Sequence, residues 1–395
     1  MPDPLEFTYQ ALPGRVVFGA GAARQQLAAE VDRLGGRRVL LVTGPREAGR
    51  AAELAAPLQD RVVATFSAVV EHVPIEVARA ARSAAADGTA DLLLAIGGGS
   101  TIGTAKAVAM TSGLPILAVP TTYAGSELTP VWGLTENGRK TTGIDPVVQP
   151  RTVVYDAELT LTLPAPMAVA SGMNAMAHSV EAFWAPGRNP VTALSASESI
   201  TALAAGLRAL HADPDSVEAR AQVLYGAYLA GAAFAVAGSG LHHKICHVLG
   251  GAYRLPHAQT HSVVLPYVVA VNAPAAPDAA ARISAALASG QADGLASGRA
   301  AGVAAGVAGA APPTGDPARE LFALNRALGN VRSLEQLGLL ESDLDQAAGL
   351  VLDVVPKDNP VPLTLTDVRA LLQAAWAGTD PADPADPVQT TQRIR

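Results

Sequence analysis

The chain has 395 residues, of which 49% are hydrophobic and 16% charged, so it is long and apolar enough for two folded domains and is not a disordered protein. Its net charge of −7, without any run of lysine or arginine, argues against binding to nucleic acid. A single cysteine excludes an intrachain disulfide, and the sequence shows neither a signal peptide nor a continuous apolar stretch of membrane-spanning length. We therefore expect a cytoplasmic protein that does not enter a membrane.

Short apolar runs alternate with helical segments over roughly the first 120 residues. We predict strands over 15–18, 37–42, 62–66, 92–96 and 116–119. Helices are predicted over 22–34, 47–56 and 75–87, and another from about residue 102. Apolar runs of four to six residues between helices indicate a parallel sheet that is covered on both faces.

The pattern changes after about Leu163, where strand-like runs nearly vanish and helical periodicity continues to about Ala377. Many of these residues are alanine or glycine, which indicates helices in close contact. We predict a Rossmann-like α/β dinucleotide-binding domain over residues 1–162. An all-helical substrate and catalytic domain is expected over residues 163–395.

A glycine-rich loop, Gly97-Gly98-Gly99-Ser100, follows the most apolar predicted strand and opens a helix. Glycine lets the backbone approach a pyrophosphate closely, and free N–H groups at a helix start bind the anion. The loop matches neither G-x-G-x-x-G nor a Walker A sequence, which disfavours an ordinary Rossmann enzyme or a P-loop NTPase. We interpret it as a phosphate loop rather than a plain tight turn.

A second loop, Pro120–Glu127, also follows a predicted strand and carries hydroxyl groups that could contact the cofactor. Its candidate residues are Thr121, Thr122 and Ser126. At the end of another strand, Thr43 is followed by glycine and not by the acid that usually holds the ribose 2′-OH of NAD. We therefore expect that both NADH and NADPH are used.

Histidines are concentrated in the second half of the chain. Asn174 and His178 are four residues apart, as are His243 and His247, so each pair would share one face of a helix. His257 follows ten residues later. Two such pairs with a loop histidine would suit a metal ion, whereas an ordinary packed or surface role is favoured for His72, His211 and His261.

Charge argues against tight metal binding at these residues. A typical divalent site includes a carboxylate, but the corresponding helix position here holds Asn174, a neutral and weaker donor. Three neutral imidazoles and one amide offer no compensating negative charge. We therefore expect the affinity for a metal to fall, although some occupancy could survive with a substrate carboxylate as an extra ligand.

Taken together, these motifs resemble the iron-containing alcohol dehydrogenase superfamily, over nearly the whole chain. The resemblance implies a dehydroquinate synthase-like fold. Metal-dependent members carry aspartate where this chain has Asn174 and Gly103. Those two departures, together with Gly240–Gly251 and Lys140–Gly143, look like the maleylacetate reductase branch.

That branch resemblance implies a homodimer that reduces the C=C bond of maleylacetate, a small dicarboxylate, to 3-oxoadipate with NADH or NADPH. In aromatic-ring degradation such an enzyme would work without a required metal. Charge on the enolate formed by hydride transfer would need a cation nearby. Candidate catalytic residues are His178, Lys244, His243, His247 and His257. Candidate substrate contacts are Thr121, Ser126, Asn174, Lys244 and Tyr253, although packing between helices is the favoured role for the tyrosine.

Three alternatives remain open. A metal-dependent alcohol dehydrogenase of the same superfamily is disfavoured by Asn174. A dehydroquinate synthase-like lyase would share the fold but would use NAD only transiently and would need a metal. A binding protein without catalytic activity is disfavoured by the density of histidines.

Overall fold

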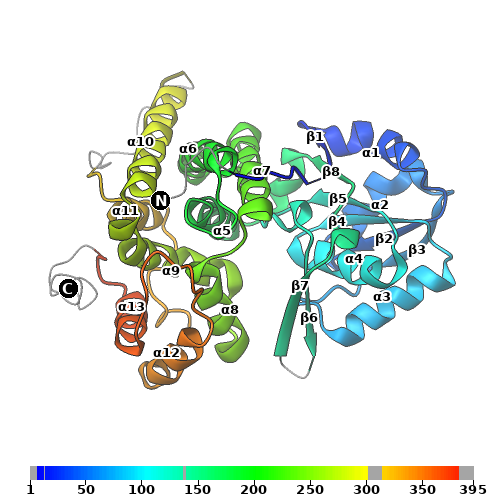
Figure 1. Ribbon diagram of the computed structural model, residues 1–395. Coiled ribbons are helices and arrows are strands. Elements are labelled where there is room, and N and C mark those ends of the chain that lie inside the picture. Colours follow the sequence, from blue (N-terminus) through cyan, green and yellow to red (C-terminus); the bar gives the residue numbers. More distant parts are fainter. Residues whose placement is uncertain (1–6, 13, 137–138, 301–313, 382–395) are drawn as a thin grey trace. The chain divides into compact units, whose positions relative to one another are not determined.

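The computed structural model describes residues 7–12, 14–136, 139–300 and 314–381 (Figure 1). It contains two compact units. Residues 11–163 form an α/β unit, and the chain from Pro164 onward forms a helical unit that also includes residues 7–10. Residues 7–10 therefore belong with the helices and not, as expected, with the sheet.

The α/β unit is built on a six-stranded parallel sheet with the strand order β1-β8-β5-β4-β2-β3. Its strands are β1 (Arg15–Phe18), β2 (Val39–Thr43), β3 (Val62–Phe66), β4 (Leu92–Gly97), β5 (Ile116–Pro120) and β8 (Thr152–Tyr155). The helices are α1 (Ala22–Arg33), α2 (Ala48–Ala55), α3 (Ile75–Asp87) and α4 (Gly99–Ser112). All strands predicted from the sequence are confirmed, and β8 is an additional one.

Both faces of the sheet are covered, because side chains of a strand point alternately to opposite faces. Leu92, Leu94 and Ile96 of β4 belong to a buried cluster that includes residues of α1 and α2. On the other face, α4 packs against β4, β5 and β2, and α3 packs against α4. The central strands β2, β4 and β5 are buried along their whole length, which explains their continuous apolar runs.

An antiparallel hairpin of β6 (Val131–Glu136) and β7 (Arg139–Ile144) was not predicted from the sequence. It joins the unit through Thr135, whose N–H donates to the Val73 carbonyl and whose hydroxyl donates to the His72 carbonyl. The hairpin therefore fixes the segment that precedes α3.

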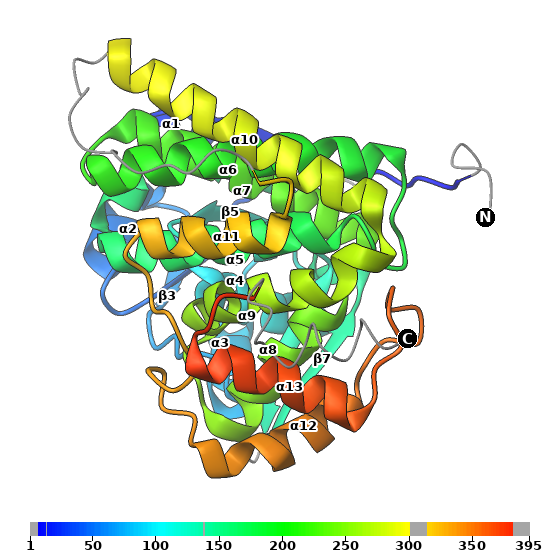
Figure 2. The same ribbon diagram turned by 90° about the vertical axis from the view of Figure 1, so that its left-hand side faces the viewer.

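The second unit contains helices and no strands among its described residues, as the sequence predicts (Figure 2). Its long helices are α5 (Ala165–Glu181), α6 (Pro190–Ala212), α7 (Val217–Ala237), α8 (Leu241–Tyr253), α9 (His257–Asn272) and α10 (Pro277–Ala300). The shorter ones are α11 (Pro317–Ala327), α12 (Leu344–Leu352) and α13 (Leu365–Ala377).

Helix α5 packs against α6, α7 and α9, and all but its first residues are buried. Small residues allow the close contacts that the composition indicates: a Cβ added to Gly290 of α10 would lie 2.4 Å from the Thr201 carbonyl oxygen of α6. The helices α8, α9, α12 and α13 share a second buried cluster. Helix α5, which is packed against three other helices, therefore holds its polar side chains away from water.

No single helix among the described residues is both long and apolar enough to cross a bilayer. The pair α7 and α8, bent by 99° at the break between them, meets the length and composition criteria only when taken together.

Candidate active site

Two loops lie side by side at the carboxyl ends of the neighbouring strands β4 and β5. The Thr121 N–H, at the start of the second loop, donates to the Gly97 carbonyl at 3.2 Å. Helix α4 begins directly after Gly98, and no side chain caps its first N–H groups. An uncapped helix start on a glycine loop is a ready anion site.

Close packing explains why this loop needs glycine. The φ angle of Gly97 is 153°, and a Cβ there would lie 2.4 Å from Thr101 Oγ1 and 2.7 Å from Glu47 Oε2. A Cβ on Gly98 would lie 3.0 Å from Thr122 Cγ2 of the second loop. The loop predicted to bind phosphate is therefore a compact turn of glycines, which offers backbone groups and no side chains to a ligand. Ser100, partly exposed, follows in the first turn of α4.

A buried lysine holds the second loop and the chain that follows it. Lys106 Nζ donates to the carbonyl oxygens of Ser126 (2.6 Å), Thr129 (2.8 Å) and Val131 (2.8 Å). Burial lowers the pKa of Lys106 to about 7, while the nearby charge of Glu127 raises it. Burial likewise raises the pKa of Glu127, which accepts a hydrogen bond from the Tyr155 hydroxyl at 2.8 Å.

A carboxylate lies beside the glycine loop, at the carboxyl ends of the strands. Glu47, four residues after Thr43, accepts a hydrogen bond from the Thr121 hydroxyl at 2.5 Å and lies beside Gly97. Thr43 itself is buried, and its hydroxyl has no hydrogen-bond partner among the described residues. Glu47 thus places a carboxylate near the end of β2, just before α2 begins.

The glycine at position 103 is explained by its neighbour in space. A Cβ there would lie 3.0 Å from Val73 Cγ2, so an aspartate would push against the segment before α3. His72 and Val73 both have left-handed backbone angles, with φ of 65° and 49°. This strained segment fills the space into which an aspartate at Gly103 would project.

In the helical unit, six histidines from three helices form one group, which we call the imidazole cluster. It consists of His178 from α5, His242, His243 and His247 from α8, and His257 and His261 from α9. The four histidines predicted from the sequence, His178, His243, His247 and His257, thus lie in one cluster. His242 and His261 also belong to it.

His243 lies at the centre of this cluster. Its ring centroid is 4.9 Å from that of His178, 4.8 Å from His261 and 6.2 Å from His247. The ring of Phe234, 4.7 Å away, packs against both His243 and His178. The rings of His257 and His261 are 4.4 Å apart. His243 is buried and His247 exposed, so the cluster extends from the interior to the surface.

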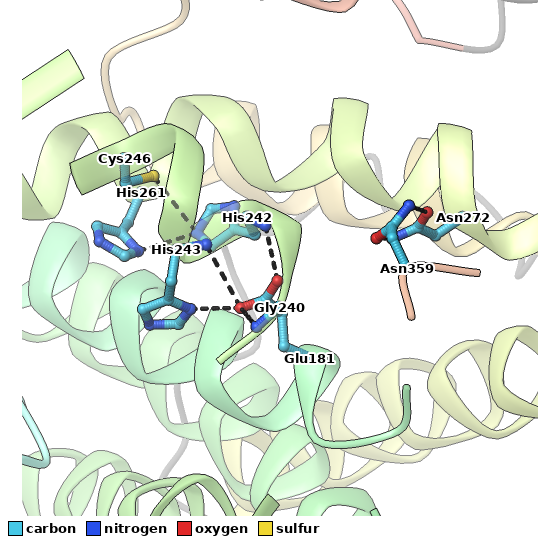
Figure 3. A network of polar contacts seen from close by, with 8 residues as sticks. All are labelled: Glu181, Gly240, His242, His243, Cys246, His261, Asn272 and Asn359. Carbon is cyan, nitrogen blue, oxygen red and sulfur yellow. Dashed lines mark hydrogen bonds and ion pairs between the residues drawn. The ribbon is translucent and has the colours of Figure 1, made fainter. Parts of the chain in front are cut away.

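Glu181, the last residue of α5, holds the start of α8 (Figure 3). Its carboxylate accepts the backbone N–H groups of Gly240 (3.0 Å) and His242 (2.7 Å). It also lies 2.5 Å from Nδ1 of His243. Glu181 has no exposed surface, so this is a fully buried carboxylate in contact with an imidazole.

A second polar contact joins His242 to His261 at 2.9 Å between Nε2 and Nδ1, with the Cys246 thiol 3.7 Å from the same Nε2 (Figure 3). The donor atoms of these three buried side chains lie within 4.8 Å of one another. His261 is therefore buried and bonded, as the sequence reading allowed, and it also belongs to the imidazole cluster.

Burial sets the charge state of much of this cluster. It lowers the pKa of His178, His242 and His261 well below the usual value, and the neighbouring imidazoles lower it further. These three rings are therefore neutral near pH 7. His243 differs from these three rings in that it contacts the buried carboxylate of Glu181.

The remaining predicted residues have different surroundings. Asn174 is buried on the same face of α5 as His178, and its Oδ1 has no hydrogen-bond partner among the described residues. Lys244 is half-buried in the first turn of α8. Tyr253 packs on the cluster of apolar side chains around α12, and its hydroxyl donates to the Asp343 carbonyl at 3.4 Å. That contact agrees with the packing role favoured for this tyrosine.

Sequence reasoning missed Glu181, although a signal was present. Asn174, His178 and Glu181 are spaced i, i+4 and i+7, so they fall on one face of an otherwise apolar helix. A charged residue on such a face needs a partner, because burying an unpaired charge is costly. The sequence does not show that this partner is the start of α8.

Comparison with protein families gives two matches that together span most of the chain. Residues 13–157 match the iron-containing alcohol dehydrogenase model, and residues 168–376 match the C-terminal model of the Fe-containing alcohol dehydrogenase family.

Individual relatives are similar over almost their whole length. A maleylacetate reductase from Sphingobium indicum is 46% identical over 377 residues, 95% of this chain and 99% of the relative. An iron-containing alcohol dehydrogenase structure from Corynebacterium glutamicum is 46% identical with a TM-score of 0.86, covering 96% of this chain and 99% of the other. The maleylacetate reductase structure from Agrobacterium tumefaciens is 39% identical with a TM-score of 0.85, covering 95% and 99%.

Proposed function

The chain belongs to the iron-containing alcohol dehydrogenase family, and from that premise we propose that it is a maleylacetate reductase that uses NADH or NADPH. The observation that carries this proposal is 46% identity to a maleylacetate reductase over 95% of the chain. The imidazole cluster supports it, because its central ring, His243, contacts a buried carboxylate and because position 174 holds a neutral amide.

The family name implies iron, but the side chains present do not fit a tightly bound divalent ion. Asn174 offers a neutral amide where a divalent ion prefers a carboxylate. Among the described histidine, cysteine and carboxylate side chains, the donor atoms of His242, Cys246 and His261 lie close together, and the two histidines already bond to each other. Burial raises the pKa of the Cys246 thiol well above its usual value, which disfavours the metal-binding thiolate. No required metal is part of this proposal.

The α/β unit fits a dinucleotide through its chemistry. The uncapped start of α4 and the glycine loop offer N–H groups to the pyrophosphate, and the hydroxyl-bearing loop held by Lys106 lies next to them. When bound, the reduced nicotinamide supplies a hydride to the C=C carbon conjugated to the ketone of maleylacetate.

The helical unit supplies the charge and the proton that the substrate then needs. Negative charge develops on the enolate oxygen of the substrate, where a cation lowers the barrier most. A protonated His243 meets that need, and transfer of its Nε2 proton to the α-carbon would complete the reduction to 3-oxoadipate. Asn174 and Lys244 would contact the carboxylates of the substrate. Replacing His243 or His247 by alanine should lower kcat on the order of 10²-fold.

The decisive measurement is NADH oxidation on addition of maleylacetate, with and without a chelator. We expect one NADH to be consumed for each maleylacetate, with 3-oxoadipate as product and no loss of rate in the chelator. Activity that disappears with chelator and returns with Fe²⁺ or Zn²⁺ would identify a metal-dependent alcohol dehydrogenase instead. Turnover without net NADH consumption would identify a lyase.

A further inference from the structure

The contact between Glu181 and His243 has a direction, because a carboxylate only accepts hydrogen bonds. Glu181 Oε1 accepts from the backbone N–H of His242, while Oε2 accepts from Gly240 and faces Nδ1 of His243. An imidazole nitrogen 2.5 Å from such an oxygen must carry the hydrogen. The proton of neutral His243 is therefore fixed on Nδ1.

The other ring nitrogen of His243, Nε2, can carry a second proton. Nε2 of His243 is buried and has no hydrogen-bond partner among the described residues. The groups around the ring are Phe234 and the imidazoles of His178, His242, His247 and His261. Glu181 is the carboxylate in contact with it. A second proton on this ring would thus be carried by Nε2, with its charge stabilised by Glu181.

We propose that Glu181 is a positioning residue for the reduction: it fixes the tautomer and orientation of His243, so that Nε2 is the atom that donates a proton to the substrate. The inference rests on the proposed function. Hydride adds to the conjugated carbon and the Nε2 proton passes to the α-carbon, which leaves neutral His243 with hydrogen on Nδ1. Solvent then returns the proton to Nε2.

Glu181 also fixes the ring in space. By accepting backbone N–H groups from Gly240 and His242, the carboxylate sets where α8 begins, and His243 lies in the first turn of that helix. A glutamine cannot replace both functions. One of its two terminal groups is an NH₂, which would face either the helix start or Nδ1 of His243.

The test combines Glu181→Gln with His243→Asn and the double variant. If Glu181 acts through His243, we expect Glu181→Gln to lower kcat on the order of 10²-fold, with a much smaller change in the KM for NADH. In the His243→Asn background the same change should lower kcat less than about threefold, because the two residues act as one unit. Losses that multiply in the double variant would overturn the proposal.

A matched control is Glu30→Gln, which removes another buried carboxylate. Glu30 is paired with Arg15 and Arg33 at 3.0 Å in the α/β unit. We expect this variant to lose stability while kcat stays within about twofold of the original chain. An equal loss of kcat in Glu30→Gln would show that removing any buried carboxylate has this effect, and would overturn the role given to Glu181.

The ring nitrogens can be observed without any variant of Glu181 and without substrate. In the unsubstituted chain labelled with ¹⁵N-histidine, the His243 signals, assigned by their loss in His243→Asn, should show hydrogen on Nδ1. A neutral ring with hydrogen on Nε2 alone would overturn the proposal even if Glu181→Gln does not fold. Lack of maleylacetate turnover by the unsubstituted chain would instead contradict the proposed function and leave this readout intact.

Discussion

At the scale of single residues, we expect Glu47 to influence how the proposed cofactor pocket accepts a 2′-phosphate. The carboxylate lies beside Gly97 and the hydroxyl of Thr121, at the edge where the nucleotide would bind. Negative charge there favours a ribose hydroxyl and repels a phosphate. The expectation that both cofactors are used thus depends on how strongly the Glu47 carboxylate repels the 2′-phosphate of NADPH.

We predict that Glu47→Gln raises kcat/KM for NADPH relative to NADH by about three- to tenfold, which corresponds to roughly 0.6–1.4 kcal/mol. Initial rates with each cofactor at saturating substrate give this ratio directly. The exposed Glu53, on the same helix α2, provides the control variant Glu53→Gln. An unchanged ratio in Glu47→Gln would mean that the carboxylate faces away from the ribose.

At the scale of elements, Lys106 of α4 ties together the chain from Ser126 to Val131. The ammonium group meets three carbonyl oxygens and the Thr129 hydroxyl, so it needs all of its hydrogens. Its pKa of about 7 places the loss of one proton in the working range of pH. Above that pH the amine has two hydrogens left and its lone pair faces oxygen atoms.

We therefore predict that the KM for NADH rises as the pH increases from about 6 to about 8.5. Lys106→Met should raise this KM at every pH and remove the pH dependence. It should also lower the free energy of unfolding by several kcal/mol, because each carbonyl left without a donor costs about 1–3 kcal/mol. Denaturant unfolding and initial rates measure both effects, and the same substitution at the exposed Lys357 is the control. A flat KM profile in the unsubstituted chain would contradict the role of the Lys106 charge.

Elements with strong local signals were predictable from the sequence, and long-range contacts were not. The strands β1 to β5 follow from apolar runs, and the helices of the second unit follow from periodicity. The hairpin β6–β7 was missed although Asn137-Gly138, a common hairpin turn sequence, lies between its strands. Helix α4 begins at Gly99, before the predicted start near 102, because glycines conceal a helix start.

The residues of the candidate site were also only partly predictable from the sequence. Helical spacing predicted that His178, His243, His247 and His257 share a site, since i and i+4 positions lie on one face. It could not reveal that His261 bonds to His242 or that Glu181 of α5 receives the start of α8. Those contacts depend on how three helices pack, which no local pattern encodes.

At the scale of the whole molecule, the histidines are unequally divided between the two units. His72 is the single histidine of the α/β unit, whereas the helical unit buries three neutral imidazoles, those of His178, His242 and His261. Burial lowers the pKa of each below the unfolded value of about 6.5. Below that pH the unfolded chain binds protons that the folded unit does not, so stability is present above about pH 6.5 and is lost as the pH falls.

We predict that the free energy of unfolding of the helical unit falls below about pH 6.5 by up to roughly 1.4 kcal/mol per pH unit for each of these histidines. The change can be followed by urea unfolding of a Trp132→Phe variant, in which Trp184 and Trp376 report on the helical unit alone. His261→Asn should make the slope against pH shallower by about a third, since it removes one of three such groups. The α/β unit, followed through Trp132 in a chain with Trp184→Phe and Trp376→Phe, should show a weaker dependence. Equal slopes in the two units would mean that the buried imidazoles do not set the response of this protein to acid.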